Sequence, residues 1–194
     1  PPRYVAEHAD QLRSRYDERR ASEAISRHRA TISGGPDFAY RLCLERVSEA
    51  QLRKLDLSSW TLAFSGAEPV RADTLRQFRT QFAPAGFAAG AVYPCYGLAE
   101  STLFVAGGRR GAGMVAQDFS SRSLARGVVE SQAESEESTT LVGCGRTVSG
   151  HAVRIVDPVS LAVRDASGIG EIWATGPSIG SGYWNKPDVS RNTF

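Results

Sequence analysis

Residues 61–95 constrain the possible folds of this chain more than any other stretch. Residues 61–65, "TLAFS", predict a short apolar strand, and "GAEP" predicts a turn. Residues 70–82 predict a helix whose apolar positions Leu75, Phe78 and Phe82 share one face, and residues 91–95, "AVYPC", predict a second strand. A strand, a helix and a strand in this order form a βαβ unit, which is nearly always right-handed with parallel strands. We therefore expect the loops that follow both strands to lie at the same edge of the sheet, where open α/β sheets bind ligands.

The segments before this unit predict more helix. Residues 31–47 indicate a strand, a "GGP" turn and a helix with Asp37 as its N-cap and apolar positions at Phe38, Leu42 and Val47. Residues 1–30 are rich in Arg and Glu with little apolar periodicity, which favours a mostly solvated helix or two.

The segments after the unit are of a different kind. Residues 107–140 contain the flexible "GGRRGAGM" and the acidic "ESQAESEESTT", and they predict a long polar surface excursion in which Phe119 and Leu124 are able to pack. The strand-like "HAVRIVD" and "GEIWATG" predict a small antiparallel β unit. We therefore expect an α/β fold, a parallel βαβ sheet with flanking helices followed by this β unit, divided at 1–30, 31–106, 107–140 and 141–194.

The composition argues against a nucleic-acid partner and against a membrane span. Its 194 residues include 23 Lys and Arg against 21 Asp and Glu, a balance that does not indicate nucleic-acid binding. No apolar run approaches the roughly 20 residues of a spanning helix, so no membrane span is expected. The three cysteines, Cys43, Cys95 and Cys144, are spaced neither as a disulfide framework nor as a zinc pattern. These features predict a cytoplasmic protein.

The stretch "YPCYGLAEST", residues 93–102, carries the clearest chemistry. Gly97 allows close approach of a ligand to the backbone, Glu100 offers a hard oxygen for the Mg²⁺ of a nucleotide, and the ring of Tyr96 is able to stack on a base. The alternative is that Glu100 is an ordinary acid at a helix start. In "SGAEP", Gly66 and Ala67 leave the backbone open to a flat ring, although an ordinary turn between strand and helix explains them equally well.

Three motifs in order carry a family resemblance. "SGAEPV", "YPCYGLAEST" and "GEIWATGPSIGSGYWNKPD" resemble the adenylate-forming superfamily, most closely its fatty acyl-AMP ligases, from about Glu23 to Phe194. The resemblance implies the N-terminal domain fold of these enzymes, with ATP, AMP and Mg²⁺ as ligands, a fatty acid as substrate and an acyl carrier protein as acceptor. It implies an adenine site at Gly66, Ala67, Glu68 and Tyr96. It further implies a catalytic and metal-binding role for Glu100, with Ser101 and Thr102 close to the phosphate.

The resemblance also implies a lipid tunnel and a larger parent enzyme. The family's acyl-binding wall corresponds to "GGPDFAY", so that Gly35, Phe38 and Tyr40 would line the tunnel, with ordinary core packing as the alternative. The family's phosphate loop, ribose-binding aspartate and catalytic lysine have no counterpart in this sequence. We therefore expect a piece of the large N-terminal domain that forms no acyl-AMP by itself.

Two other functions compete with this hypothesis. "GPSIG", residues 176–180, satisfies the G-x-S-x-G pattern of a serine hydrolase, but the glycines and proline after Ser178 oppose the helix that such a nucleophile requires. The order of the three histidines, His8, His28 and His151, does not single out a partner for the serine. A noncatalytic nucleotide-binding or interaction fragment is the other alternative.

Overall fold

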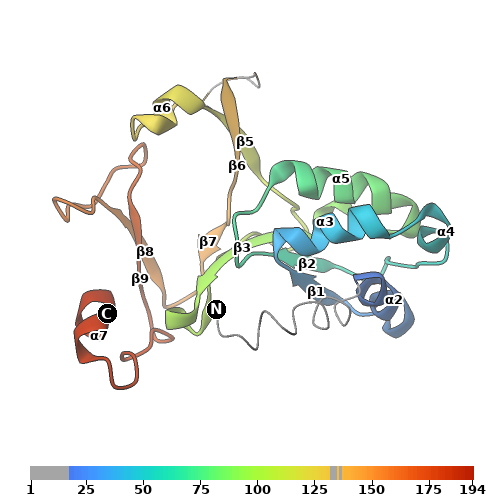
Figure 1. Cartoon of the computed structure of the whole chain (residues 1–194), viewed down its shortest axis with the longest axis horizontal. Helices are drawn as coiled ribbons and strands as arrows, with labels where there is room; N and C mark the ends of the chain where they lie inside the picture. Colours follow the sequence, from blue (N-terminus) through green and yellow to red (C-terminus); the bar gives the residue numbers. More distant parts are fainter. Residues whose placement is uncertain (1–17, 132–134, 136) are drawn as a thin grey trace, which may run out of the picture.

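The computed structural model describes residues 18–131, 135 and 137–194, which form a mixed α/β fold (Figure 1). Its helices are α2 (Glu18–His28), α3 (Asp37–Arg46), α4 (Glu49–Leu52), α5 (Ala72–Phe82), α6 (Ser121–Ala125) and α7 (Pro187–Thr193), with short 3-10 turns η1 (Ala83–Ala85), η2 (Ala89–Ala91) and η3 (Ala99–Ser101). Its strands are β1 (Ile32–Gly35), β2 (Leu62–Ser65), β3 (Val92–Leu98), β4 (Leu103–Gly107), β5 (Ala116–Ser120), β6 (Ser138–Val142), β7 (Arg146–Thr147), β8 (Ala152–Val156) and β9 (Glu171–Thr175).

The main sheet contains five strands in the order β1-β2-β3-β4-β7. β1, β2 and β3 are parallel, and β2, α5 and β3 form the predicted βαβ unit. β4 runs antiparallel to β3, and β7 runs antiparallel to β4. The expected α/β fold with a parallel βαβ sheet is therefore confirmed, with two antiparallel strands added at one side.

The core lies between the parallel strands and the helices α3 and α5, which pack together over one face of the sheet (Figure 1). Phe78 of α5 is its centre, since its ring stacks on Phe82 at 4.2 Å and meets Tyr40, Trp60 and Phe87 edge to face at 5.0–6.0 Å. Leu75, Phe78 and Phe82 are fully buried, as the helical periodicity predicts.

Helix α3 differs from the sequence prediction at its start. Its N-cap is Pro36, and Asp37 is the first helical residue, buried at 3% exposure. Asp37 accepts instead from the Arg71 backbone N–H and the Thr74 hydroxyl at the start of α5, both at 3.0 Å. The predicted N-cap is therefore wrong, because this carboxylate caps a neighbouring helix.

The buried face of α3 also differs from the prediction. Val47, directly after the helix, is buried as predicted, and Tyr40 and Cys43 point into the core with it. Phe38, however, is 40% exposed, and Leu42 is half-buried. The spacing of 40, 43 and 47 is as helical as that of the predicted apolar set, and the packing on α5 selects it.

Helix α2 is a mostly exposed helix, as predicted for this segment, with one buried side. Ser22 and Ile25 are buried, and Ile25 belongs to the main core, while Glu23, Arg27 and His28 are exposed. The prediction for residues 1–17 lies outside the described residues.

The predicted excursion forms an antiparallel ribbon of β5 and β6 with α6 after β5 (Figure 1). Phe119 and Leu124 are half-buried there, and the last residues of the acidic run, 138–140, lie in β6. β8 and β9 form the antiparallel pair expected near the C-terminus, whereas β7 joins the main sheet. The division into four segments stays a prediction. In the part of the chain that the structure describes, no helix has the length and apolarity to cross a membrane.

Candidate functional site

The loop after β2 lies next to β3 at the carboxyl edge of the parallel strands. Gly66 is buried there. A larger residue would not fit, because a Cβ at this position would lie 2.8 Å from Cys95 Sγ and 2.9 Å from the Cys95 carbonyl oxygen. Ala67 takes a left-handed backbone conformation with a φ of 66°, which costs a non-glycine residue roughly 1–2 kcal/mol. Such strain is often stored where a loop serves a ligand.

Glu68 in this loop bonds the backbone of a neighbouring segment. Its Oε1 accepts from the Phe38 backbone N–H at 2.6 Å, at the start of α3. Asp37 at the start of α3 bonds the start of α5 in turn, so the first turn of α3 and the segment from Glu68 to Thr74 hold each other. Glu68 therefore lies in the loop after β2, as the motif predicts, but the Glu68 carboxylate holds this loop against the "GGPDFAY" segment.

Tyr96 and Gly97 lie near the end of β3, and Glu100 lies in the turn η3 between β3 and β4. Gly97 lies at a register shift in the β3–β4 pairing, and a Cβ there would lie 1.6 Å from the Leu103 carbonyl oxygen. Backbone contact with β4, rather than a ligand, thus requires this glycine. Thr102 and Leu103 both have positive φ, 50° and 84°, so the chain reverses sharply directly after Glu100.

Tyr96 and Glu100 line one cleft of about 800 Å³. We call it the Glu100 cleft; its other walls are Leu98, Glu171, Ile172, Trp173, Ala174, Ile179, Arg191, Asn192, Thr193 and Phe194. Gly66, Ala67 and Glu68 do not line this cleft, nor do Ser101 and Thr102. The structure thus brings Tyr96 and Glu100 together in one cleft, whereas the other predicted nucleotide-binding side chains lie outside it.

The Glu100 carboxylate is held by a residue that the sequence analysis did not assign. Tyr183 donates its hydroxyl hydrogen to Glu100 Oε1. This bond, together with the glutamate's own backbone N–H, holds the pKa of Glu100 below its ordinary value, and the same bond raises the pKa of Tyr183. The carboxylate is therefore ionised at neutral pH and available to a cation.

Ser101 and Thr102 contact the segment that follows β9. Ser101 is fully buried, and its carbonyl oxygen accepts from Ser178 Oγ at 2.9 Å. Thr102 Oγ1 donates to the Ser178 carbonyl oxygen at 2.7 Å. The predicted closeness of these two residues to a phosphate stays a prediction, because these hydrogen bonds join them to protein atoms.

The structure pairs Ser178 with a histidine. His151 Nε2 lies 2.7 Å from Ser178 Oγ, although these residues are 27 positions apart, and the order of the histidines did not reveal the pair. The hydrolase arrangement is nevertheless incomplete. Ser178 lacks the positive φ of a strained elbow, and no helix begins directly after it, since α7 starts only at Pro187. The other imidazole nitrogen faces the Ser149 carbonyl rather than a carboxylate.

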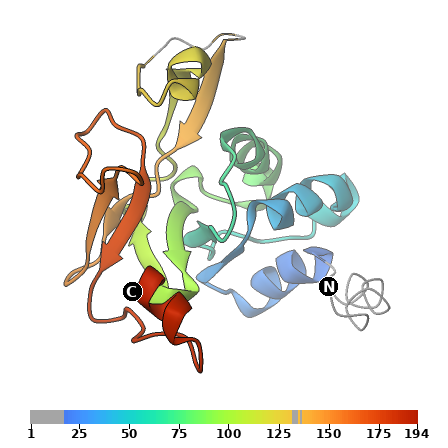
Figure 2. The same ribbon diagram turned by 60° about the vertical axis from the view of Figure 1, so that its left-hand side comes forward.

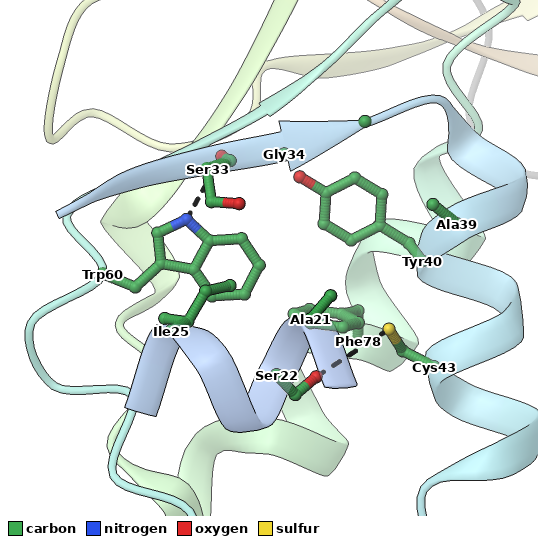
Figure 3. Close-up of a pocket in the computed structure, with 11 residues that line it drawn as sticks. Ala21, Ser22, Ile25, Ser33, Gly34, Ala39, Tyr40, Cys43, Trp60 and Phe78 are labelled. Carbon is green, nitrogen blue, oxygen red and sulfur yellow. Dashed lines mark hydrogen bonds between the residues drawn. The ribbon is translucent and has the colours of Figure 1, made fainter. Parts of the chain in front are cut away.

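A small cavity of about 60 Å³ lies between α2, β1 and α3 (Figure 3). Its walls include Gly35 and Tyr40, two of the predicted acyl-site residues, with Ile25, Trp60 and Phe78. Phe38, the third, does not line it, because this side chain lies on the exposed side of α3. The Trp60 indole N–H donates to the carbonyl oxygens of Ser33 and Leu62 at 3.2 and 3.0 Å, which fixes one wall. The surface that lines the cavity is mostly apolar, so the cavity suits an apolar group.

The sequence matches a family model over most of its length. The model described as AMP-binding enzyme matches residues 9–184. The chain belongs to the AMP-binding enzyme family. This match contains the stretch from about Glu23 over which the motifs resemble the adenylate-forming enzymes, and it begins somewhat nearer the N-terminus.

Curated relatives and solved structures agree with this assignment. The chain is 47% identical over 171 residues to the medium-chain-fatty-acid acyl-carrier-protein ligase TtuA of Teredinibacter turnerae, covering 88% of this chain and 26% of that protein. It is 36% identical over 172 residues to the 4-hydroxyphenylalkanoate adenylyltransferase of Mycobacterium tuberculosis, covering 89% of this chain and 28% of that protein. A fatty acyl-adenylate ligase from L. pneumophila, solved with acyl adenylate and pyrophosphate, superimposes with a TM-score of 0.83 at 41% identity, covering 88% of this chain and 30% of that one. The chain thus spans less than a third of the length of these relatives.

Proposed function

We propose that this chain is part of a fatty acyl-AMP ligase, which activates a fatty acid with ATP and passes the acyl group to an acyl carrier protein. In the reaction, a carboxylate oxygen of the fatty acid forms a bond to the α-phosphorus of ATP, and the bond from that phosphorus to the leaving pyrophosphate oxygen breaks. The observation that carries the proposal is the Glu100 cleft of an AMP-binding enzyme, in which an ionised carboxylate lies beside an aromatic ring.

The cleft residues suit a Mg²⁺-bound nucleotide. Among the residues that the structure describes, no three His, Cys, Asp or Glu side chains form a cluster, so a cation would share one protein carboxylate with phosphate oxygens. Mg²⁺ is commonly held in this way, and Glu100 offers the hard oxygen that it prefers. When bound, the ion would neutralise charge on the phosphates, while Tyr96 would stack on the adenine and Glu100 would orient the ion.

The apolar cavity between α2, β1 and α3 is the proposed acyl subsite. Its volume of about 60 Å³ holds only a small part of a fatty acid, so the lining side chains must move when the substrate binds. The mostly apolar walls favour an alkyl tail over a charged or polar substituent. The relatives TtuA and the L. pneumophila enzyme, whose names specify fatty acyl substrates, support the same substrate class.

The test is fatty-acid-dependent exchange between ATP and pyrophosphate, measured on the complete enzyme that contains this sequence. Glu100→Gln keeps the side-chain volume but removes the anionic ligand, and the exchange rate should fall by about 100-fold with a greater requirement for Mg²⁺. Glu171→Gln is the matched control, since Glu171 lines the same cleft without bonding Tyr183. Equal losses in both variants, or exchange in the wild type that ignores fatty acids, would contradict the proposal.

A further inference from the structure

The chain after β9 closes around the turn that carries Glu100. Gly180 N–H donates to the Glu100 carbonyl oxygen at 2.7 Å, and Ser178 bonds both Ser101 and Thr102. We call residues 178–183 the clasp. Figure 2 shows the C-terminal part of the chain, with α7, beside the β3–β4 turn, although the two regions are about 80 residues apart in sequence.

Tyr183 at the end of the clasp is itself fixed. Its backbone N–H donates to Ser190 Oγ at 2.8 Å, and its ring meets Phe194 edge to face at 5.4 Å. The side chain is half-buried, so its ring has few alternative positions. The hydroxyl that reaches Glu100 is therefore presented from a rigid support, which is what orients a ligand side chain effectively.

Glu100 has little other restraint on its carboxylate. In residues 18–131, 135 and 137–194 no Lys or Arg forms a salt bridge with it, and Tyr183 is the side chain that bonds it. A glutamate side chain has three rotatable bonds, and fixing them costs free energy when a cation binds. A donor that fixes the carboxylate beforehand removes part of that cost.

We propose that Tyr183 is the positioning residue for the Glu100 carboxylate, which it holds by its hydroxyl in the orientation that accepts the nucleotide-bound cation. This inference rests on the proposed function. Tyr183 acts through Glu100 and does not line the Glu100 cleft itself. Partners that orient metal ligands in this way typically change metal affinity by 10–100-fold when they are removed.

The test uses Tyr183→Phe in the complete enzyme, because phenylalanine keeps the ring and its contact with Phe194. Binding of ATP is measured by calorimetry without fatty acid, so no turnover is involved, over a series of Mg²⁺ concentrations. The Mg²⁺ concentration for half-maximal binding should rise about 10-fold, while ATP binding without Mg²⁺ should not change. Tyr93→Phe is the matched control, since it removes the hydroxyl of another half-buried tyrosine on the same strand as Tyr96.

A second variant distinguishes positioning from a merely structural contact. In a Glu100→Gln background, Tyr183→Phe should have no further effect on the Mg²⁺ dependence, because the carboxylate on which it acts is gone. Weakening of ATP binding to the same extent with and without Mg²⁺ would show that the clasp only supports the fold, which overturns the inference.

The outcomes also separate this inference from the proposed function. If Glu100→Gln shifts the Mg²⁺ dependence but Tyr183→Phe does not, the positioning role is wrong and the proposed function stands. If the wild-type enzyme binds ATP with no Mg²⁺ dependence, or if Glu100→Gln leaves that dependence unchanged, the role of Glu100 is wrong and the inference falls with it.

Discussion

Removal of the Asp37 carboxylate should destabilise the fold strongly, because it connects two core helices. Asp37 is 3% exposed and accepts two hydrogen bonds, from the Arg71 N–H and the Thr74 hydroxyl, both at 3.0 Å. A hydrogen bond to a charged group contributes about 1.5–3 kcal/mol, and loss of a helix cap costs about 0.5–2 kcal/mol. Since these contributions overlap, Asp37→Ala should lower the free energy of unfolding by about 3 kcal/mol. Asp37→Asn keeps one acceptor oxygen and should cost about 1 kcal/mol.

The measurement is urea unfolding of the chain, followed by far-UV circular dichroism. Glu49→Ala is the control, since Glu49 is exposed and forms a surface ion pair with Arg53 at 2.9 Å, which should contribute nothing measurable. A loss below about 1 kcal/mol for Asp37→Ala would refute the reasoning, because the buried carboxylate would then be no more important than a surface pair.

Four further predictions address other parts of the chain. Ser178 should not react with a fluorophosphonate probe, and labelling that depends on His151 would revive the hydrolase hypothesis. Burial raises the pKa of the Cys95 and Cys144 thiols, so iodoacetamide should alkylate them more slowly at neutral pH in the folded chain than in the urea-unfolded chain. The rate in the folded chain should increase at higher pH, and equal rates in the folded and unfolded chains would contradict this prediction. Glu68→Gln keeps an acceptor for the α3 N-terminus and should barely change ATP affinity by calorimetry, whereas a large loss would assign the carboxylate to the adenine. Shortening residues 108–140 in the complete enzyme should raise acyl-CoA formation without abolishing adenylation, as product analysis with coenzyme A would show; abundant acyl-CoA before the deletion would contradict the ligase type.

The sequence was sufficient to predict the parallel part of the sheet. Leu75, Phe78 and Phe82 repeat with the helical period, and short apolar runs flank them, so local patterns alone define the βαβ unit. The direction of β4 was not predictable in this way. It depends on the positive φ angles of Thr102 and Leu103. Residues with these side chains rarely adopt such a backbone conformation, and only the packed fold maintains it.

The candidate site was predictable only in part, for a related reason. Glu100 and Tyr96 follow directly from one motif, which spans the end of β3 and the turn after it, and both line one cleft. Tyr183 lies 83 positions from Glu100, and no periodicity connects them. Asp37 looks like an ordinary N-cap, since the sequence does not reveal that a second helix start lies within hydrogen-bonding distance.

The turns at the carboxyl ends of β1, β2 and β3 are held by groups from elsewhere in the chain. Glu68 holds the start of α3 after β1, Asp37 holds the start of α5 after β2, and the clasp holds the turn after β3. Several of the motif residues, Glu68 among them, therefore already bond protein atoms before any ligand arrives. A nucleotide bound at this edge would meet mainly exposed backbone, the Tyr96 ring and the Glu100 carboxylate. These groups lie on or next to turns that are already fixed in the folded chain, so little further conformational entropy is lost when the ligand binds. This preorganisation raises the affinity for the ligand.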